Sequence, residues 1–438
     1  MLKELKLNKV GPYEALEAHF APRLNLITGD NGLGKSFLLD IAWWALTRRW
    51  PRDLNKALVS GYGARPTSAK EGSIEFSVEG KANKDVRYRS TFSPSDEAWT
   101  GKAGRPYNPG LVLYAMADGG FALWDPARNY WKQKGNTDVQ ERIPAYVFGP
   151  HEVWDGLYDP ERGQLCNGLV NDWAGWQKEN GPAFQMLCDV LRRLSPPGQA
   201  ELKPGPFARI SLDDVRDIPT LVTPYGKPVP VLHASSGVRR VVALAYLLVW
   251  AWQEHQKASA LLEQAITPQV VFLIDEIEAH LHPRWQRSIV SALLDVTQAL
   301  AQTHAQVQLI VATHSPLVLA AVEPQFNGDL DAWFDLDMVK NEEGTAEQVL
   351  FQRRHYVRLG DVSRWLVSEA FDLGAPTSLQ AEQALHDARE AMGCLGRGQA
   401  VAADRLAKIE QALQASLADI DPFWALWRYA LAPAETAK

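Results

Sequence analysis

The 438-residue sequence is poor in cysteine and has no long apolar run, and each deficit excludes a class of protein. The three cysteines (Cys166, Cys188 and Cys394) are far apart and form no CxxC pair, which argues against a disulfide framework or a cysteine zinc site. The longest apolar stretch, 241–252, is too short to cross a bilayer and predicts a buried helix. Because no secretory leader opens the sequence, we expect a cytoplasmic protein with no membrane partner.

An excess of positive charge is also lacking, since 45 Lys and Arg face 52 Asp and Glu. The net charge of −7 excludes a surface coated for nucleic-acid binding and leaves room only for a local basic groove. Candidate contacts to DNA or to a partner protein are Arg48, Arg49, Arg52, Arg353, Arg354 and Arg358. Internal repeats, sustained heptads and low-complexity tails are absent as well.

Hydrophobic periodicity predicts a mixed order of strands and helices. In the first half we expect strands at 2–7 and 23–28, a helix at 36–46, hairpins at 71–92 and 111–124, and a strand at 145–148. In the second half we expect helical spacing at 160–196, an irregular Pro-rich stretch at 197–230, a helix at 237–254, a buried strand at 269–274, a helix at 283–301, a buried strand at 308–312, a hairpin at 335–352 and helices throughout 361–438.

The strongest motif is a phosphate loop between a predicted strand and a predicted helix, matching GxxxxGK(S/T). Its glycines let the backbone wrap phosphates, and its amides and the helix N-terminus face the anion. Lys35 then reaches the β and γ oxygens of ATP, and Ser36 is a ligand of Mg²⁺. The alternative, a glycine-rich turn with an exposed lysine, is disfavoured by the strand–loop–helix context. The nucleotide-contacting residues expected here are Gly29, Asp30, Asn31, Gly32, Leu33, Gly34, Lys35, Ser36 and Phe37.

Two carboxylates, Asp275 and Glu276, directly follow the apolar strand at 269–274. A buried parallel strand would deliver them to the carboxyl edge of a sheet, where α/β sites lie. Asp275 is expected to hold Mg²⁺, directly or through water, and Glu276 to orient and polarise the attacking water. Alone, such a pair is more often a helix N-terminal charge, but a phosphate loop in the same chain favours catalysis.

Two further segments could contact phosphate. His314 follows the next predicted strand and can reach the γ-phosphate or the attacking water, unless it is an incidental residue of a helix start. A long apolar helix begins at Ser235, Ser236 and Gly237. The N-terminus of this helix is a second potential anion-binding site, which we call the second anion seat. Because one ATP needs one phosphate loop, this second seat is explained only if it faces a nucleotide bound by another subunit.

Together these residues resemble the ATP-binding-cassette class of P-loop ATPases, and they occur in the order typical of that class. The segments 278–283 and 312–316 are similar to the soluble branch with SMC, RecF and OLD-like ATPases. The whole arrangement is most like standalone ATPases of antiphage defence systems (Septu- and PARIS-like). The resemblance implies an α/β ABC-ATPase fold with a mixed central sheet, antiparallel β-hairpins, a helical insert and a C-terminal helical region.

The resemblance also implies roles for single residues. Two ATP molecules would lie head-to-tail between two copies, with Ser235, Ser236 and Gly237 acting in trans. Lys35, Glu276 and His314 would be catalytic, Ser36 and Asp275 would hold the metal, and 278–280 would take the place of the cross-dimer loop. The signature departs from the Leu-Ser-Gly-Gly-Gln of transporters, which weakens the inference of a dimer. Nominal candidates for the lid glutamine are Gln164 and Gln177.

The expected organisation is an ATPase core at 1–154 and 230–355, a lid-like insert with a Pro-rich connector at 155–229, and a helical region at 356–438. The implied function is a homodimeric or larger ATP-gated switch that controls a separate nuclease or toxin, or that clamps DNA. The alternatives are a transporter motor, a DNA-repair ATPase or, through Asp335 and Asp337, a nuclease within this chain.

The 16 tryptophans and the tail helix give two further expectations. Some tryptophans lie in the insert and the tail, away from the predicted nucleotide site, and are expected to mark the surface that binds a partner. They are Trp154, Trp173, Trp176, Trp365, Trp424 and Trp427. One face of the predicted tail helix is expected to pack on the body of the protein rather than on a partner; it holds Ala381, Ala384, Leu385, Ala388 and Met392.

Overall fold

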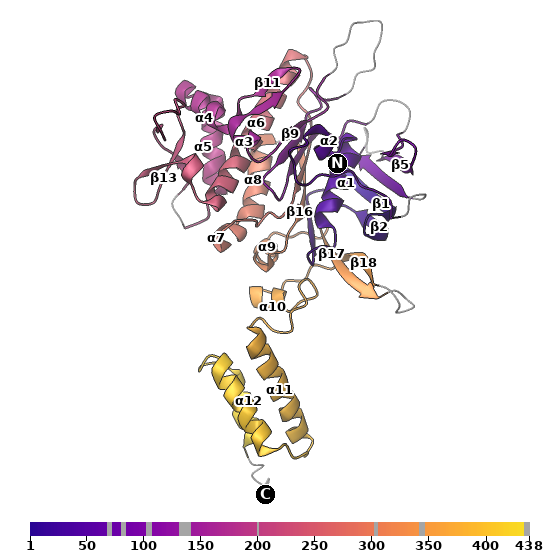
Figure 1. Cartoon of the computed structure of the whole chain (residues 1–438), viewed down its shortest axis with the longest axis vertical. Coiled ribbons are helices and arrows are strands. Elements are labelled where there is room, and N and C mark those ends of the chain that lie inside the picture. The colour runs from indigo at the N-terminus through magenta and orange to yellow at the C-terminus, as the bar shows by residue number, and fades with distance from the viewer. Residues whose placement is uncertain are drawn as a thin grey trace. The chain divides into compact units, whose positions relative to one another are not determined.

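The computed structural model describes residues 1–67, 72–79, 85–101, 107–130, 142–198, 201–301, 305–340 and 347–432. The chain forms two compact units, Met1–Arg358 and Leu359–Lys438 (Figure 1). Each unit has a hydrophobic core of its own. In the described parts of the chain, no helix is long and apolar enough to span a membrane.

The larger unit is built on an eight-stranded mixed sheet with the order β18-β17-β3-β16-β15-β7-β8-β9. Its five central strands are parallel: β17 (Asp331–Lys340), β3 (Leu24–Gly29), β16 (Gln306–Ala312), β15 (Gln269–Ile274) and β7 (Leu111–Ala115). Antiparallel strands complete both edges: β18 (Glu347–Arg354), β8 (Phe121–Trp124) and β9 (Tyr146–Phe148). Strand β15 is a run of buried apolar residues from Val270 to Ile274, as expected for a parallel strand covered on both faces. Strands β3 and β16 are also largely buried, and their polar residues Asn25, Thr28 and Gln308 are hydrogen-bonded inside.

A second, antiparallel sheet covers one side of the central sheet. Its order is β2-β1-β4-β5-β6, with β1 (Leu2–Val10), β2 (Tyr13–His19), β4 (Ser73–Glu79), β5 (Asp85–Ser93) and β6 (Ala98–Trp99). Helix α1 (Lys35–Thr47) contributes most of its residues to one core shared with both sheets, including Trp43 and Trp44. The short α2 (Pro51–Leu54) follows. Burial on both sides explains why α1 is apolar around its whole circumference.

The helices gather beyond the other side of the central sheet (Figure 1). They are α3 (Glu152–Asp155), α4 (Gly168–Glu179), α5 (Pro182–Leu194), α6 (Ser236–Leu261), α7 (Pro283–Gln286), α8 (Ile289–Ala301) and α9 (Pro316–Val322). The insert before α6 also carries a hairpin of β10 (Leu157–Asp159) and β11 (Gly163–Cys166), and a small sheet of β12 (Lys203–Pro204), β13 (Thr220–Val222) and β14 (Pro228–Pro230). A 3-10 turn, Val231–His233, leads into α6.

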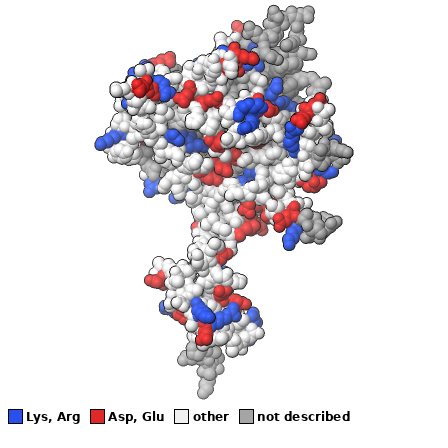
Figure 2. Space-filling view, in the orientation of Figure 1, with Lys and Arg blue, Asp and Glu red and all other residues white. Residues whose placement is uncertain are grey.

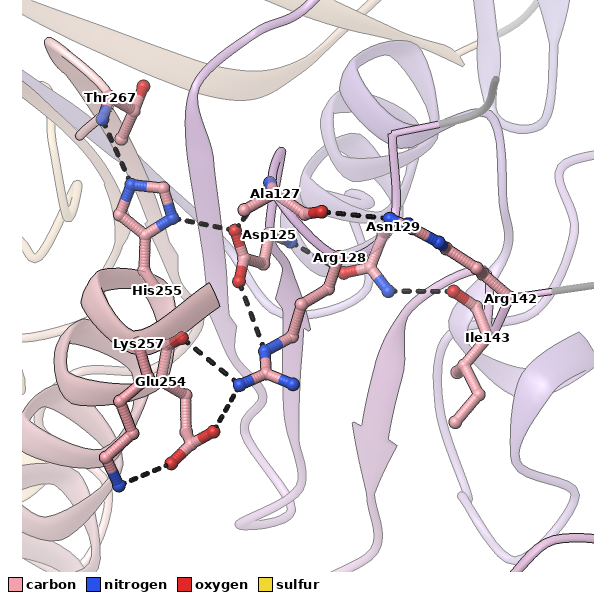
Figure 3. A network of polar contacts seen from close by, with 10 residues as sticks. All are labelled: Asp125, Ala127, Arg128, Asn129, Arg142, Ile143, Glu254, His255, Lys257 and Thr267. Atoms are coloured by element: carbon pink, nitrogen blue, oxygen red, sulfur yellow. Dashed lines mark hydrogen bonds and ion pairs between the residues drawn. The ribbon is translucent and has the colours of Figure 1, made fainter. Parts of the chain in front are cut away.

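A buried polar network fixes the last turns of α6 (Figure 3). Nε2 of His255 accepts the Thr267 N–H at 3.0 Å, so the proton lies on Nδ1, which donates to Asp125 at 2.7 Å. Asp125 follows β8, and Thr267 precedes β15. Arg128 adds a hydrogen bond to Glu254, whose carboxylate also pairs with Lys257. Both ring nitrogens of His255 are therefore used to join α6 to two strands.

The smaller unit is helical. It contains α10 (Val362–Leu366), α11 (Leu379–Gly396), α12 (Ala403–Ser416) and α13 (Phe423–Leu431). Ser378 caps α11 by accepting the Ala381 N–H at 3.2 Å. The small-residue face of α11 packs on Ile409, Leu413 and Trp427 of its own unit. The expectation that this face packs on the body of the protein is wrong, because α12 and α13 cover it.

The fold class expected from the sequence is confirmed, and the differences are local. Strand β2 was not expected because its buried residues, Tyr13, Leu16 and Ala18, do not alternate strictly with exposed ones, and because it is rich in Ala and Glu. The helical interpretation of 160–196 is wrong at its start, where β11 pairs with β10, and 197–230 holds a small sheet. The helix expected at 283–301 is two helices, α7 and α8. In the hairpins expected at 71–92 and 335–352, residues 80–84 and 341–346 lie outside the described residues.

Candidate nucleotide-binding site

Three predicted site segments meet at one edge of the central sheet. Because β3, β16 and β15 are adjacent and parallel, their carboxyl ends lie side by side. The phosphate loop follows β3, Asp275 and Glu276 follow β15, and His314 follows β16. Sites in open α/β sheets lie at this edge. The topology thus brings together residues that are up to 285 positions apart, as the span from Gly29 to His314 shows.

The phosphate loop has a backbone that requires glycine. Gly29, Gly32 and Gly34 have φ angles of 131°, 83° and 96°. A Cβ atom on Gly29 would lie 2.3 Å from the Leu336 carbonyl oxygen, whereas one on Gly32 would meet nothing within 4 Å. The Tyr13 hydroxyl, which the sequence analysis missed, donates to the Gly34 carbonyl at 2.8 Å and fixes the loop from β2. The phosphate loop is thus fixed by Tyr13 and Leu336 on one side, and the space next to Gly32 is unoccupied by described residues.

Lys35 lies at the first position of α1, and its side chain folds back over the loop. Nζ donates to the carbonyls of Gly29 and Asp30 at 2.7 and 2.8 Å. Burial lowers the pKa of Lys35 to about 8, and the charge of Asp275 opposes that shift most strongly. The ammonium group is therefore still mostly charged at pH 7. Phosphate oxygens could take the place of the two carbonyls as acceptors of its hydrogen bonds.

Ser36 and Asp275 fit a magnesium ion by their donor chemistry. Asp275 is 3% exposed, and its Oδ1 atom has no hydrogen-bonding partner among the described residues. Burial raises the pKa of Asp275 to about 6, while a hydrogen bond with Ser36 lowers it. A buried carboxylate oxygen without a partner is costly, and Mg²⁺ prefers oxygen ligands. The hydroxyl and the carboxylate together would satisfy the metal and relieve that cost.

Glu276 has an unusual backbone for its residue type. Its φ angle is 46°, in the left-handed region that disfavours side chains with a Cβ, and its side chain is half-buried. The backbone carbonyl accepts the Ala279 N–H at 2.9 Å, which closes a tight turn directly after β15. Such strain at a sheet edge is typical of functional residues, because the surrounding fold must hold them in place.

His314 is half-buried between the phosphate loop and the acidic strand end. Burial lowers its pKa, Lys35 lowers it further, and Glu278, Glu276 and Asp30 oppose the shift. The imidazole is thus mostly neutral at pH 7 and can donate from one nitrogen and accept at the other. Because the charges of Lys35 and Glu276 both act on the pKa of His314, the three side chains lie within electrostatic range of one another.

The Ser235–Ser236–Gly237 segment forms the start of α6, as expected. The Ser235 hydroxyl caps the helix by accepting the Val238 N–H at 3.5 Å, and both serines are exposed. Gly237 is buried, and a Cβ there would lie 2.6 Å from the His280 carbonyl oxygen. Between described residues, no hydrogen bond joins this segment to the phosphate loop of its own chain.

Several other expected residues have structural contacts. Gln164 donates to Cys166 within the insert, and the Gln177 amide bonds to Trp173 and Gly205. Asp335 accepts from Thr28 inside the central sheet, so the Asp335–Asp337 pair lies in the ATPase sheet itself. The guanidinium group of Arg48 stacks on Trp44 and donates a hydrogen bond to Ser90. These internal contacts make it a poor candidate for contacting an external partner.

The sequence analysis also missed Asp40, one turn beyond Ser36 on α1. Asp40 is 7% exposed and accepts a hydrogen bond from the Tyr114 hydroxyl of β7 at 3.0 Å. Burial raises its pKa to about 8, and the neighbouring charge of Asp275 adds to the rise. The available signal was an acidic residue inside an otherwise apolar helix.

Charge on the face of the molecule shown in Figure 2 is mixed. Lys and Arg are interspersed there with Asp and Glu, and neither sign forms a continuous field. The basic residues of 353–358 line a cavity of about 510 Å³ together with the acidic Glu323 and Asp331. This pattern gives no broad basic surface on that face.

Comparison with known proteins gives matches to a Septu protein and to two probable ATPases of retrons. The Septu protein PtuA of Bacillus thuringiensis is 21% identical over 325 residues, which cover 73% of each chain. The Retron Vc95 probable ATPase of Vibrio cholerae is 34% identical over 97 residues (22% of this chain), and the Retron Ec83 probable ATPase of Escherichia coli is 28% identical over 146 residues (33% of this chain). These two matches span only 17% and 22% of the retron proteins' own length.

Among solved structures, an Smc head bound to the C-winged helix domain of ScpA is 13% identical, with a TM-score of 0.40, and covers 80% of this chain and 97% of that one. The SMC head domain of Thermotoga maritima has the same identity, a TM-score of 0.37 and coverages of 80% and 98%. The family described as "AAA domain, putative AbiEii toxin, Type IV TA system" (AAA_21) matches residues 24–320, which include the phosphate loop, the start of α6, the acidic pair and His314. The chain therefore belongs to this family of P-loop ATPase domains.

Proposed function

We propose that this chain binds Mg-ATP at the carboxyl edge of the central sheet and hydrolyses it to ADP and phosphate. The observation that carries the proposal is the buried Oδ1 atom of Asp275, which lacks a partner among the described residues and follows the strand two places from β3. A magnesium ion bound there would be the partner that this buried carboxylate oxygen lacks, which explains why it is left unpaired beside a phosphate loop. Membership of the ATPase family supports the same interpretation.

Each residue then has a role in the reaction. Lys35 and the loop amides hold the β- and γ-phosphates, and Ser36 and Asp275 hold Mg²⁺, which neutralises phosphate charge when bound. Glu276 accepts a proton from water as the water oxygen bonds to the γ-phosphorus and the bond to the β–γ bridging oxygen breaks. His314, being neutral, donates to a γ-phosphate oxygen. The ADP oxygen takes the negative charge of the broken bond.

We further propose that the second anion seat acts between two copies of the chain. Ser235 and Ser236 are exposed at the N-terminus of a 26-residue helix, where free N–H groups and the helix dipole favour an anion. A head-to-tail homodimer would place each seat on the nucleotide held by the other copy. ATP would then link the two copies, and hydrolysis would release them.

The biological role follows from the relatives and belongs to the same proposal. PtuA is named for the Septu system, and two other relatives are named as retron ATPases. We propose that this chain is a nucleotide-gated switch in antiphage defence. The effector would be a separate nuclease or toxin, since Asp335, the candidate metal ligand for a nuclease, is engaged by Thr28 inside the sheet.

A mixing experiment tests both the hydrolysis and the shared site. Lys35→Ala removes the phosphate lysine, and Ser235→Glu adds a like charge at the second seat. Each variant alone should be inactive, because every shared site that its copies could form is damaged. An equimolar mixture forms heterodimers with one intact site, so ATPase activity should return to roughly a quarter of the wild-type value if dimers form at random.

The control is Lys257→Ala, an exposed position on α6 that should leave activity unchanged. Activity in Lys35→Ala equal to that of the wild type would contradict the nucleotide site. A mixture as inactive as its components, with an active wild type, would contradict the shared site.

A further inference from the structure

The loop after β15 is joined to the loop after β16 by one carboxylate. Glu278 accepts a hydrogen bond from the Thr313 hydroxyl at 2.7 Å and another from the backbone N–H of His314. Thr313 is fully buried and Glu278 is half-buried, so solvent competes little for these bonds. Charge-assisted bonds of this kind are roughly twice as strong as neutral ones.

Other bonds hold the same loop from its remaining sides. The Thr313 N–H donates to the Ile27 carbonyl of β3 at 3.0 Å. Gln286 of α7 accepts from the Ser315 hydroxyl at 2.7 Å and donates to the Leu281 carbonyl at 2.9 Å. The residues on both sides of His314 are thus fixed, and Glu278 alone among these groups bonds to the backbone of His314 itself.

We propose that Glu278 is a positioning residue, whose carboxylate fixes the backbone of His314 and thereby sets where the imidazole lies beside Lys35 and Glu276. The proposal rests on the ATPase function proposed above and adds one positioning residue to that site. By sequence alone, residues 278–280 are expected in the place of the cross-dimer loop, and that expectation stays a prediction. The hydrogen bonds that the Glu278 carboxylate accepts from Thr313 and His314 lie within its own chain.

The charge of Glu278 gives the proposal a second consequence. The groups that act on His314 are Lys35 of α1, Asp30 of the phosphate loop, and Glu276 and Glu278 after β15. Lys35 and burial lower the pKa of His314, and the three carboxylates raise it. Removing the negative charge at position 278 should therefore lower the pKa of His314 further.

Two variants separate the bond from the charge. Glu278→Ala loses both hydrogen bonds, frees the His314 loop and should lower kcat on the order of 10- to 100-fold, with KM nearly unchanged. Glu278→Gln keeps one acceptor oxygen for the His314 N–H, and the Thr313 hydroxyl can rotate to accept from the amide. This conservative variant should recover most of kcat but not the original pKa of His314.

A matched control is Glu152→Ala. Glu152 is also half-buried, and its carboxylate likewise bonds to a backbone N–H, that of Gly149, and to a side chain, that of Asn55. It lies in α3, outside the proposed site. A purely structural effect would lower stability in both alanine variants, whereas only Glu278→Ala should lower kcat.

The deciding experiment combines a double-mutant cycle with an NMR titration. If Glu278 acts through His314, Glu278→Ala should have no further effect on kcat in a His314→Ala background. Independent, multiplying losses would overturn the proposal. The pKa of His314 is read in nucleotide-free protein from the histidine resonance missing in His314→Ala. It should fall in Glu278→Gln, and an unchanged pKa would also overturn the proposal.

The titration keeps the two proposals distinguishable. A wild type that hydrolyses no ATP would contradict the proposed function, yet the titration would still decide whether Glu278 acts on His314. A wild type that hydrolyses ATP, with no response of His314 to position 278, would contradict the positioning role alone.

Discussion

Glu276 shows how the site places a functional group at a cost in stability. Its left-handed backbone, with a φ of 46°, costs on the order of 1–2 kcal/mol for a residue with a Cβ. The neighbouring Asp275 and Asp40 are buried carboxylates whose pKa values are raised by that burial. Strain and buried charge gather at the sheet edge because the fold around them is rigid enough to hold them.

The backbone strain predicts a difference between two inactive variants. Glu276→Gly and Glu276→Ala both lose the carboxylate, but only glycine adopts a φ of 46° without steric cost. Glu276→Gly should therefore be more stable than Glu276→Ala by about 1 kcal/mol. Urea denaturation of the nucleotide-free proteins measures this difference. Equal stability of the two variants would show that position 276 is not strained.

Asp40 predicts a pH dependence of stability. Its pKa is raised from 3.8 to about 8, chiefly by burial, so the folded state binds this proton more tightly than the unfolded state. The stabilisation is complete below about pH 4 and is lost as the pH rises towards 8. Asp40→Asn cannot ionise and should lose less stability than the wild type between pH 6.5 and about 8.5. Urea denaturation across this range checks it, and parallel curves for the two proteins would contradict it.

At the scale of elements, α6 connects the proposed nucleotide contact to the body of the larger unit. Its N-terminal end carries Ser235 and Gly237, and its C-terminal turns carry His255 in the buried network of Figure 3. Asp125 in that network is wholly buried, and its Oδ1 atom accepts hydrogen bonds from His255 and from the Ala127 N–H. The helix is thus fixed at one end and presents its other end for contact.

This arrangement predicts a large loss of stability for His255→Ala. The change removes one hydrogen bond from the buried Asp125 carboxylate, orphans the Thr267 N–H and opens a cavity, which together should cost about 3–5 kcal/mol. Lys257→Ala, two positions away, removes only an exposed ion pair and should cost less than about 0.5 kcal/mol. Chemical denaturation distinguishes the two. Similar small losses would show that the network does not anchor α6.

Elements with strong local patterns could be predicted from the sequence. The bounds of β15 were predicted in full, and α1 and α6 within one residue at their starts, because continuous apolar runs and caps are local signals. Strand β2 and the β10–β11 hairpin could not be predicted, since their burial depends on partners elsewhere in the chain. The split of 283–301 into α7 and α8 likewise has no Pro or Gly to mark it.

The same distinction applies to the site. The phosphate loop, Asp275, Glu276 and His314 were predicted because each motif lies directly after a strand end. Tyr13, Asp40 and Glu278 bond across elements, and no spacing in the sequence shows which loop a carboxylate or hydroxyl will reach. Contacts of this kind depend on tertiary structure, which a single sequence does not reveal.

For the whole molecule, the tryptophans give less information about partners than their number suggested. Trp173, Trp365 and Trp427 are at most 1% exposed, and Trp427 belongs to the core of the smaller unit. The expectation that they mark a partner's binding place is therefore wrong for these three. Trp154 and Trp176 of the insert and Trp424 of the tail are only partly buried and keep that interpretation as a hypothesis.

The account's central claim is that ATP joins two copies of this chain, and one measurement tests it directly. Glu276→Gln keeps the ATP contacts and slows hydrolysis, so the bound state should accumulate. Light scattering with Mg-ATP should give twice the 48.7 kDa of one chain for this variant, while the same variant without nucleotide, and Lys35→Ala with Mg-ATP, should give the lower mass of the nucleotide-free wild type. A Glu276→Gln protein whose mass does not change when Mg-ATP binds would contradict the claim.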